Sequence, residues 1–253
     1  MASYYPMDDM FLNIARGLVK GTTLLHKFGT APNISVDTTA TIWDRTDELY
    51  PWSALDTEQT LNVRVVEPNN ESNTSTALDG IDVTIEGLDD DFVEQTETVT
   101  ISGFSATTTN KFRRINRISL DAEPATNTKR VLIRTENNTV VGQINDTENS
   151  AHMAIYTVPA GKTLFLRQGT MSCQAGADGQ GEFFVRSNSV GEYFRDYHHF
   201  EVSGSGGQYM YEFGVPQPIP EKSDLDVRIK TRSNNGNFTA AYCGILIEEN
   251  LGS

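Results

Sequence analysis

Short runs of alternating apolar and polar residues fill the chain from about residue 57 onwards. Clear examples are Leu61, Val63 and Val65, then Ile81, Val83 and Ile85, and later Leu225, Val227 and Ile229. Each run is bounded by Gly, Asn, Asp or Pro. A period of two with such boundaries is typical of antiparallel strands that have one face on a core and one in solvent.

The strand-like runs fall into two series, at residues 57–148 and 149–253, with the weakest boundary near 146–150. The second series holds about eight runs, the number expected of a sandwich or jelly roll. The sequence therefore predicts an all-β protein in which an N-terminal arm precedes two β-sandwich domains, the second of them jelly-roll-like.

The arm is predicted from the one good helical pattern, at residues 7–18. Five apolar residues there share one face of a helix: Met7, Met10, Phe11, Ile14 and Leu18. Gly17 weakens the last turn, and Gly21 can end it. Because so short a helix is marginal in water, its apolar face needs a surface to lie on. That surface is either its own domain or another subunit, and we expect a docking arm.

Residues 22–56 show no strong periodic element, and prolines mark turns in them. Three aromatic residues in this stretch need burial: Trp43, Tyr50 and Trp52. They would hold the arm against its own domain or against a partner. We therefore assign residues 1–56 to the docking arm and an aromatic loop.

Charge narrows the choice of partners. The chain has 20 Lys and Arg against 34 Asp and Glu, a formal net charge of -14. This balance disfavours duplex nucleic acid and an anionic membrane surface, both of which attract clustered basic residues. The chain has neither a run of about 18 apolar residues nor a secretory signal pattern, so we expect assembly in a cytoplasm. Cys173 and Cys243 should then be reduced and unlinked.

Catalytic and metal-binding patterns are weak. His198 and His199 are adjacent, so in a strand they point to opposite faces. His26 and His152 show no carboxylate or thiol at ligand spacing. The run Asp89–Asp91 is better explained as a solvated turn than as a calcium site. We predict no catalytic, cofactor-binding or metal-binding residues, and no enzymatic activity.

Nine aromatic residues fall between positions 183 and 213, and some of them must be core while others are exposed. Exposed tyrosines suit contacts with sugars or with protein partners. A core with an adjoining subunit interface is favoured over a glycan site. The candidate interface or glycan residues are Tyr193, Tyr197, Tyr209 and Tyr211.

The following prolines and charges are expected to protect one sheet edge from further strand pairing. They are Pro216, Pro218, Pro220, Glu221, Lys222, Asp224 and Asp226.

Several segments together resemble a family of virion structural proteins of tailed bacteriophages. They are residues 12–35 (LNIARGLVKGTTLLHKFGTAPNIS), Ile42-Trp43-Asp44, Tyr50-Pro51-Trp52, residues 156–163 (YTVPAGKT) and residues 215–224 (VPQPIPEKSD). The resemblance implies a β-rich, oligomeric particle component and brings no catalytic residues with it.

The leading hypothesis is an accessory of the phage head or neck, a decoration, collar or fibre protein. Residues 1–30 would dock on other virion proteins, and residues 149–253 would form a homo-oligomer. A trimer is favoured by analogy with projecting phage proteins. The alternative is a tail-associated receptor-binding protein that recognises host glycan through the aromatic residues. A glycan-degrading enzyme is the least favoured.

Overall fold

The computed structural model describes residues 10–123, 126–189, 193–204 and 207–249. Within these ranges the helical elements are α1 (Met10–Ala15) and a 3-10 turn, η1 (Trp52–Leu55), and all the other regular elements are strands. The prediction of an all-β protein is therefore confirmed. No helix in the described ranges is long and apolar enough to cross a membrane.

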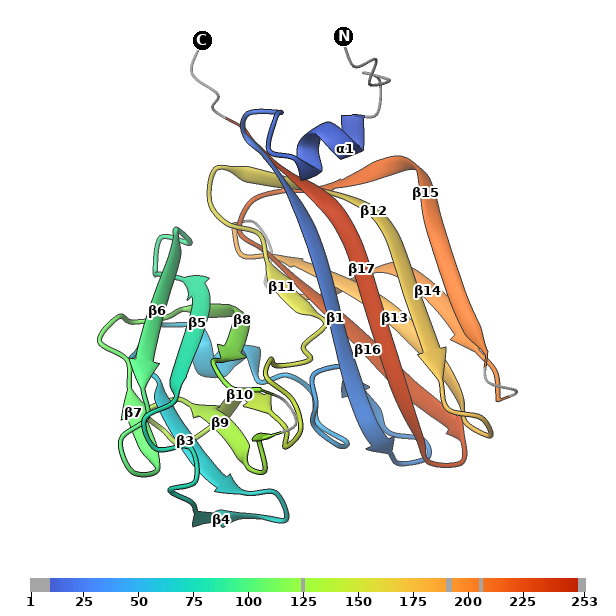
Figure 1. Ribbon diagram of the computed structural model, residues 1–253. Coiled ribbons are helices and arrows are strands. Elements are labelled where there is room, and N and C mark those ends of the chain that lie inside the picture. The colour runs from blue at the N-terminus through green and yellow to red at the C-terminus, as the bar shows by residue number, and fades with distance from the viewer. Residues whose placement is uncertain (1–9, 124–125, 190–192, 205–206, 250–253) are drawn as a thin grey trace, which may run out of the picture.

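Two facing sheets form the larger part of the molecule (Figure 1). Their strands are β1 (Thr22–Ile34), β2 (Thr39–Thr41), β11 (Ile155–Thr157), β12 (Lys162–Cys173), β13 (Asp178–Ser187), β14 (Arg195–Val202), β15 (Gln208–Ile219), β16 (Ser223–Ser233) and β17 (Gly236–Glu248). The first sheet has the order β1-β17-β12-β15. The second has the order β11-β16-β13-β14, and β2 also pairs with β16. Both sheets contribute side chains to one core, including Leu166, Val227 and Phe238. We call this part the sandwich.

A second pair of sheets lies beside the sandwich (Figure 1). Its strands are β3 (Asn62–Glu67), β4 (Asn70–Thr74), β5 (Asp82–Leu88), β6 (Glu94–Thr100), β7 (Ser105–Thr107), β8 (Arg114–Leu120), β9 (Arg130–Arg134) and β10 (Val140–Ile144). One sheet has the order β10-β9-β3-β4 with β7 on β3, and the other has the order β6-β5-β8. The alternating residues Val63, Val83 and Ile85 are buried in a common second core.

One strand of the sandwich is interrupted in sequence. Opposite β16, the register passes in order through Thr39, Ala40, Thr41, Ile42, Ile155, Tyr156 and Thr157. Their partners on β16 run without a gap from Lys230 to Asp224. Residues 43–154 are therefore an insertion within a single strand position, and we call them the insert.

The strand β1 departs from the sequence prediction. The pattern predicts no periodic element in residues 22–56, but 13 of them, Thr22–Ile34, form a strand that pairs with β17. It lies at the edge of its sheet, and its first seven residues are exposed or only partly buried. Because burial on one face is what produces alternation, an edge strand of this kind leaves little periodic signal.

The aromatic residues of the same stretch are buried as expected. Trp43 is 0% exposed, and Tyr50 and Trp52 are 4% and 6% exposed. Tyr50 packs edge-to-face on both indole rings, at centroid distances of 4.9 and 4.8 Å. All three belong to the core of the insert. They anchor the first residues of the insert.

The edge prediction is confirmed for the prolines of β15 and wrong for two carboxylates. β15 is the last strand of its sheet, and it contains Pro216 and Pro218. Proline cannot donate to a sheet ladder, so it suits an edge. Asp224 and Asp226 instead lie in β16, which has strands on both sides, and both are 0% exposed. The insert covers the face of the sheet that these carboxylates occupy, so they serve a buried joint and not an edge.

Candidate functional site

The N-terminal helix is shorter than its sequence pattern. α1 spans six residues, Met10–Ala15, where the pattern predicts 7–18, and Met7 lies outside the described residues. The chain leaves the helix at Gly17, whose φ of 69° lies in the left-handed region that favours glycine. Leu18 therefore follows the helix and is not part of it.

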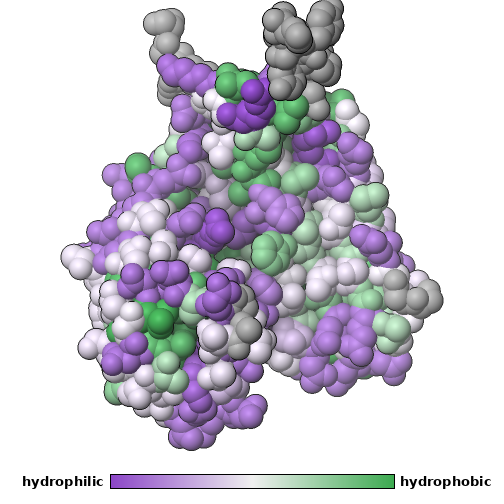
Figure 2. Space-filling model, viewed as in Figure 1, coloured by the Kyte–Doolittle hydropathy of each residue, from purple (hydrophilic) through white to green (hydrophobic). Residues whose placement is uncertain are grey.

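The apolar residues of this segment are mostly exposed. Ile14 is 3% exposed, whereas Met10, Phe11 and Leu18 are 55%, 40% and 62% exposed. The Phe11 ring lies under the Arg167 guanidinium of β12 at 3.8 Å, so the helix rests on its own sandwich. Figure 2 shows hydrophobic surface at the end of the molecule where α1 lies. We call Met10, Phe11 and Leu18 the α1 patch.

The predicted interface tyrosines lie at or near the edge strands β14 and β15. Tyr193, just before β14, is 78% exposed, and Tyr211 is 37% exposed, while Tyr197 and Tyr209 are partly buried. His198 gathers the aromatic residues from both strands, because its ring lies 4.4 Å from Tyr211 and 6.0 Å from Tyr209 between centroids. The structure thus brings Tyr209 and Tyr211 together and leaves Tyr193 apart from their ring contacts.

A cavity behind this aromatic cluster is too small for a sugar. Its volume is about 30 Å³, and Phe183, Phe200 and Tyr242 are among its lining residues. Since roughly 10–15 Å³ of such space holds one water molecule, the cavity has room for a few waters and not for a sugar ring. Any glycan contact at the cluster would therefore use the outer faces of its tyrosines.

A larger cleft separates the sandwich from the insert. It has a volume of about 720 Å³ and is lined by β1 residues and by Glu86, Glu94 and Arg117 of the insert. Lys27 of β1 also lines it and donates from Nζ to the Asn116 carbonyl oxygen at 2.5 Å. Burial, with the nearby charge of Arg117, lowers the pKa of Lys27 to about 8. The sequence gives no sign of this cleft, because β1 and the lining residues between 86 and 117 of the insert are about 60 residues or more apart in the chain.

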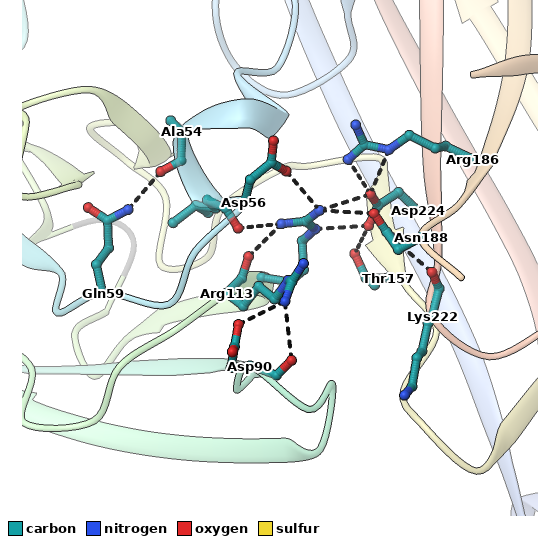
Figure 3. Close-up of polar contacts among 12 residues, drawn as sticks. Ala54, Asp56, Gln59, Asp90, Arg113, Thr157, Arg186, Asn188, Lys222 and Asp224 are labelled. Carbon is teal, nitrogen blue, oxygen red and sulfur yellow. Dashed lines mark hydrogen bonds and ion pairs between the residues drawn. The ribbon is translucent and has the colours of Figure 1, made fainter. Parts of the chain in front are cut away.

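A buried charged cluster joins the insert to the sandwich (Figure 3). Arg114 of β8 is 1% exposed, and Asp224 of β16 is 0% exposed. Arg114 donates from Nε and Nη2 to the two carboxylate oxygens of Asp224, at 3.0 and 3.2 Å. Arg186 Nε and the Thr157 hydroxyl also donate to this carboxylate, at 3.1 and 2.7 Å. Such bidentate, charge-assisted contacts are the strong class of protein hydrogen bonds.

The charges of this cluster satisfy one another. Burial alone would raise the pKa of Asp224, but the charge and hydrogen bonds of Arg114, the charge of Arg186 and the hydrogen bond of Thr157 outweigh it, so the pKa lies below its ordinary value. Burial likewise disfavours the charged form of Arg114. The charge and hydrogen bond of Asp224 outweigh this effect, so the pKa of Arg114 is raised. The cluster therefore holds two parts of the protein together through paired buried charges.

Asp226, two residues further along β16 than Asp224, is a second buried carboxylate that accepts several hydrogen bonds. Asp226 accepts hydrogen bonds from Trp52 Nε1 at 3.0 Å, from the Thr41 hydroxyl at 2.9 Å and from Arg228 Nε at 2.8 Å. Trp52 belongs to the insert, and the other two belong to the sandwich. Both carboxylates thus tie the insert to the same strand.

The remaining sequence candidates have local roles. His198 and His199 point apart as predicted, because His198 joins the aromatic cluster while His199 lies 3.6 Å from Glu182. Asp89 Oδ1 accepts the amides of Asp91 and Val93, which makes this run a turn.

Cys173 and Cys243 are both free, as predicted. They lie five rungs apart on the paired strands β12 and β17, which is about 17 Å at 3.4 Å per residue.

The prediction for His152 is wrong. Its Nδ1 lies 3.2 Å from Glu148 Oε1, and Asp44 completes a group of three ligand-bearing side chains. Glu148 is only four residues away in sequence, a spacing that could have signalled the pair. Asp44 is 108 residues away, and only the fold brings it there.

Comparison with known proteins gives little similarity. No family model and no curated protein matches the chain. Among solved structures, the VP2 subviral particle of infectious bursal disease virus is 9% identical, with a TM-score of 0.23, over 92% of this chain and 73% of that chain. The structure of the Gx strain of the same virus is 10% identical, with a TM-score of 0.22, over 91% and 73%. Scores at this level do not establish a common fold.

Proposed function

We propose that this protein is a non-enzymatic structural component of a tailed-phage virion, attached to the head or neck as a decoration, collar or fibre protein. The observation that carries the proposal is the α1 patch. Met10, Phe11 and Leu18 expose 40% or more of their surface at one end of the sandwich. Apolar side chains gathered in this way mark sites of protein–protein contact. The docking partner is another virion protein of the head, neck or tail.

The strand order supports a jelly-roll assignment for the sandwich. A jelly roll has eight strands in two four-stranded sheets. The orders β1-β17-β12-β15 and β2/β11-β16-β13-β14 fit this plan when β2 and β11 count as one strand. The insert would then be a second β-sandwich domain. Viral capsid proteins and lectins both use jelly rolls, so the fold by itself does not select a function.

The closed charge clusters support a non-enzymatic role. Asp224 and Asp226 are fully buried, and their oxygens are occupied by arginine, threonine and tryptophan donors. Such groups hold a fixed shape, as a particle component requires. The net charge of -14 supports a protein that binds neither nucleic acid nor membrane. The proposal includes self-association, with a trimer favoured.

Charging the α1 patch should prevent assembly into the particle. In a double variant, Met10→Asp with Leu18→Asp, we expect occupancy on purified phage particles to fall at least tenfold. Burying two half-exposed apolar side chains contributes roughly 2–4 kcal/mol, and about 1.4 kcal/mol is tenfold in affinity. Occupancy is measured by quantitative mass spectrometry against the major capsid protein.

The matched control is Leu49→Asp with Val93→Asp, since these residues are 49% and 53% exposed and lie away from α1. The control should assemble like the wild type, and both variants should sediment as the wild-type oligomer. Normal occupancy of the α1 variant would refute docking through this segment.

The alternative function is recognition of host-surface glycan by a tail-associated protein. The exposure of Tyr193 and Tyr211 favours it, because such rings stack on sugars. Under this alternative, Tyr193→Ala with Tyr211→Ala should leave particle occupancy normal but reduce host adsorption and binding to isolated surface glycan. Under the leading proposal, adsorption stays at the wild-type level.

A further inference from the structure

The root of the insert carries a group of side chains that its structural role does not explain. The insert leaves the sandwich after Ile42 and returns at Ile155. Asp44 lies just inside the exit point, and His152 just before the return. Both are held against the edge strand β1, because the Asp44 amide donates to the Thr30 carbonyl oxygen at 2.7 Å and the Thr30 amide donates to the His152 carbonyl oxygen at 3.3 Å.

Three potential metal ligands meet at this root. Asp44, Glu148 and His152 each offer one ligand atom, and these atoms lie within 4.8 Å of one another. His152 Nδ1 and Glu148 Oε1 are 3.2 Å apart. Two ligands bound tetrahedrally at about 2.0–2.2 Å from a zinc ion lie roughly 3.4 Å apart. This pair therefore already has the spacing of a shared ion, and a carboxylate oxygen of Asp44 lies within 4.8 Å of a ligand atom of each of the other two residues.

The charges at the root are unbalanced. Asp44 is 2% exposed, and among the described residues no lysine or arginine forms an ion pair with it. Its oxygens accept hydrogen bonds from the Thr30 hydroxyl and, at 2.9 Å, from the His152 amide. Glu148 adds a second carboxylate with a side chain that is 23% exposed. This contrasts with Asp224, whose buried charge is matched by two arginines.

The imidazole is also incompletely satisfied. His152 Nδ1 is enclosed by protein and makes no well-aligned hydrogen bond. A buried polar atom without a partner is costly, and a native structure usually has a use for it. A bound cation would supply the missing charge and a partner for Nδ1 together.

We propose that Asp44, Glu148 and His152 bind one divalent transition-metal ion, with zinc favoured and manganese second. One imidazole nitrogen and two carboxylate oxygens form a ligand set that suits these ions better than calcium, which takes oxygen ligands only. The ion joins the exit of the insert to its return and fixes both against β1. The site is independent of the proposed function, because it lies away from the α1 patch.

The test uses full-length protein without a polyhistidine tag, stripped with chelator and then dialysed. Zinc, manganese and calcium chlorides are added separately, and binding is followed by calorimetry and by thermal unfolding. We expect one zinc ion per chain and a rise in unfolding temperature of about 5–10 °C at a hundredfold excess over Kd. Cobalt(II) added to the stripped protein in place of zinc should produce visible d–d absorption bands typical of a site with a nitrogen ligand.

Three variants identify the ligands. Asp44→Asn, Glu148→Gln and His152→Gln should each weaken zinc binding at least tenfold, and Glu148→Gln should fold even if the buried Asp44 variant does not, because Glu148 is partly exposed. His199→Gln is the matched control, since His199 also lies beside a glutamate but outside the group, and it should bind zinc normally. Absence of saturable zinc or manganese binding by the wild type would overturn the proposal, as would unchanged affinity in Glu148→Gln and His152→Gln.

Discussion

Replacing Asp224 by asparagine should lower the free energy of unfolding by about 3–5 kcal/mol. The substitution keeps the shape of the side chain and removes its charge. Arg114 and Arg186 would then be buried without their shared counter-charge, since Asp224 is 0% exposed and accepts from both guanidinium groups. Guanidinium-induced unfolding, followed by tryptophan fluorescence, measures the change directly, because Trp43 and Trp52 lie in the core of the insert.

An exposed ion pair provides the control for Asp224. Arg232 and Glu201 lie 2.9 Å apart with side chains that are 49% and 61% exposed. Exposed pairs contribute about 0–1 kcal/mol, so Glu201→Gln should change stability by less than about 1 kcal/mol. A similar small change in Asp224→Asn would mean that water reaches the cluster and that its charges do not hold the insert in place.

The same carboxylate gives the protein a defined acid response. The folded pKa of Asp224 is lowered, so its contribution to stability is present above the unfolded pKa of about 3.9 and is lost as pH falls through the folded value. Wild-type stability should therefore decline more steeply than that of Asp224→Asn below about pH 4. Unfolding midpoints measured between pH 3 and 7 compare the two slopes.

Replacing Gly29 by alanine should destabilise the protein by roughly 3 kcal/mol, which for a chain of this size is about 6–12 °C in unfolding temperature. A Cβ atom at Gly29 would lie 2.4 Å from the Ala154 amide nitrogen and 2.7 Å from the Ile42 carbonyl oxygen. Both are backbone atoms at the root of the insert, so neither can turn away as a side chain could. The methyl group would force β1 away from the point where the insert leaves and re-enters the sandwich. Differential scanning calorimetry measures the shift.

Gly169 of β12 is the matched control, because a Cβ atom there meets nothing within 4 Å. Gly169→Ala should be neutral or stabilise the protein by about 0.4–1 kcal/mol, since alanine reduces the entropy of the unfolded chain. If both variants unfolded at the same temperature, the close approach of β1 to the root would not be a constraint on the fold.

The strands that sequence predicts correctly are those with one buried face. Val63 and Val65 in β3, or Leu225 and Val227 in β16, alternate because every second side chain enters a core. The edge strand β1 has little such burial in its first half, and its pattern is correspondingly weak. The helix is predicted too long, because Gly17 turns the chain before Leu18 can continue it.

Other features depend on contacts that no local pattern contains. From their alternation with Leu225 and Val227, Asp224 and Asp226 would be assigned to a solvent-exposed strand face. They are buried only because the insert packs over that face. Asp44 and His152 are separated by 108 residues and meet only at the root of the insert. Likewise, β2 and β11 lie end to end as one strand only because both pair with successive residues of β16.

The sequence by itself determined the all-β class, the burial of the aromatic residues near Trp43 and the proline-protected edge. Each of these follows from local periodicity, residue type or spacing. The tertiary structure alone decided that 43–154 is an insert, that buried charges hold it, and that Asp44, Glu148 and His152 lie together. The physical reason is that burial and charge pairing depend on which distant surfaces meet, whereas alternation reports only that a surface is covered.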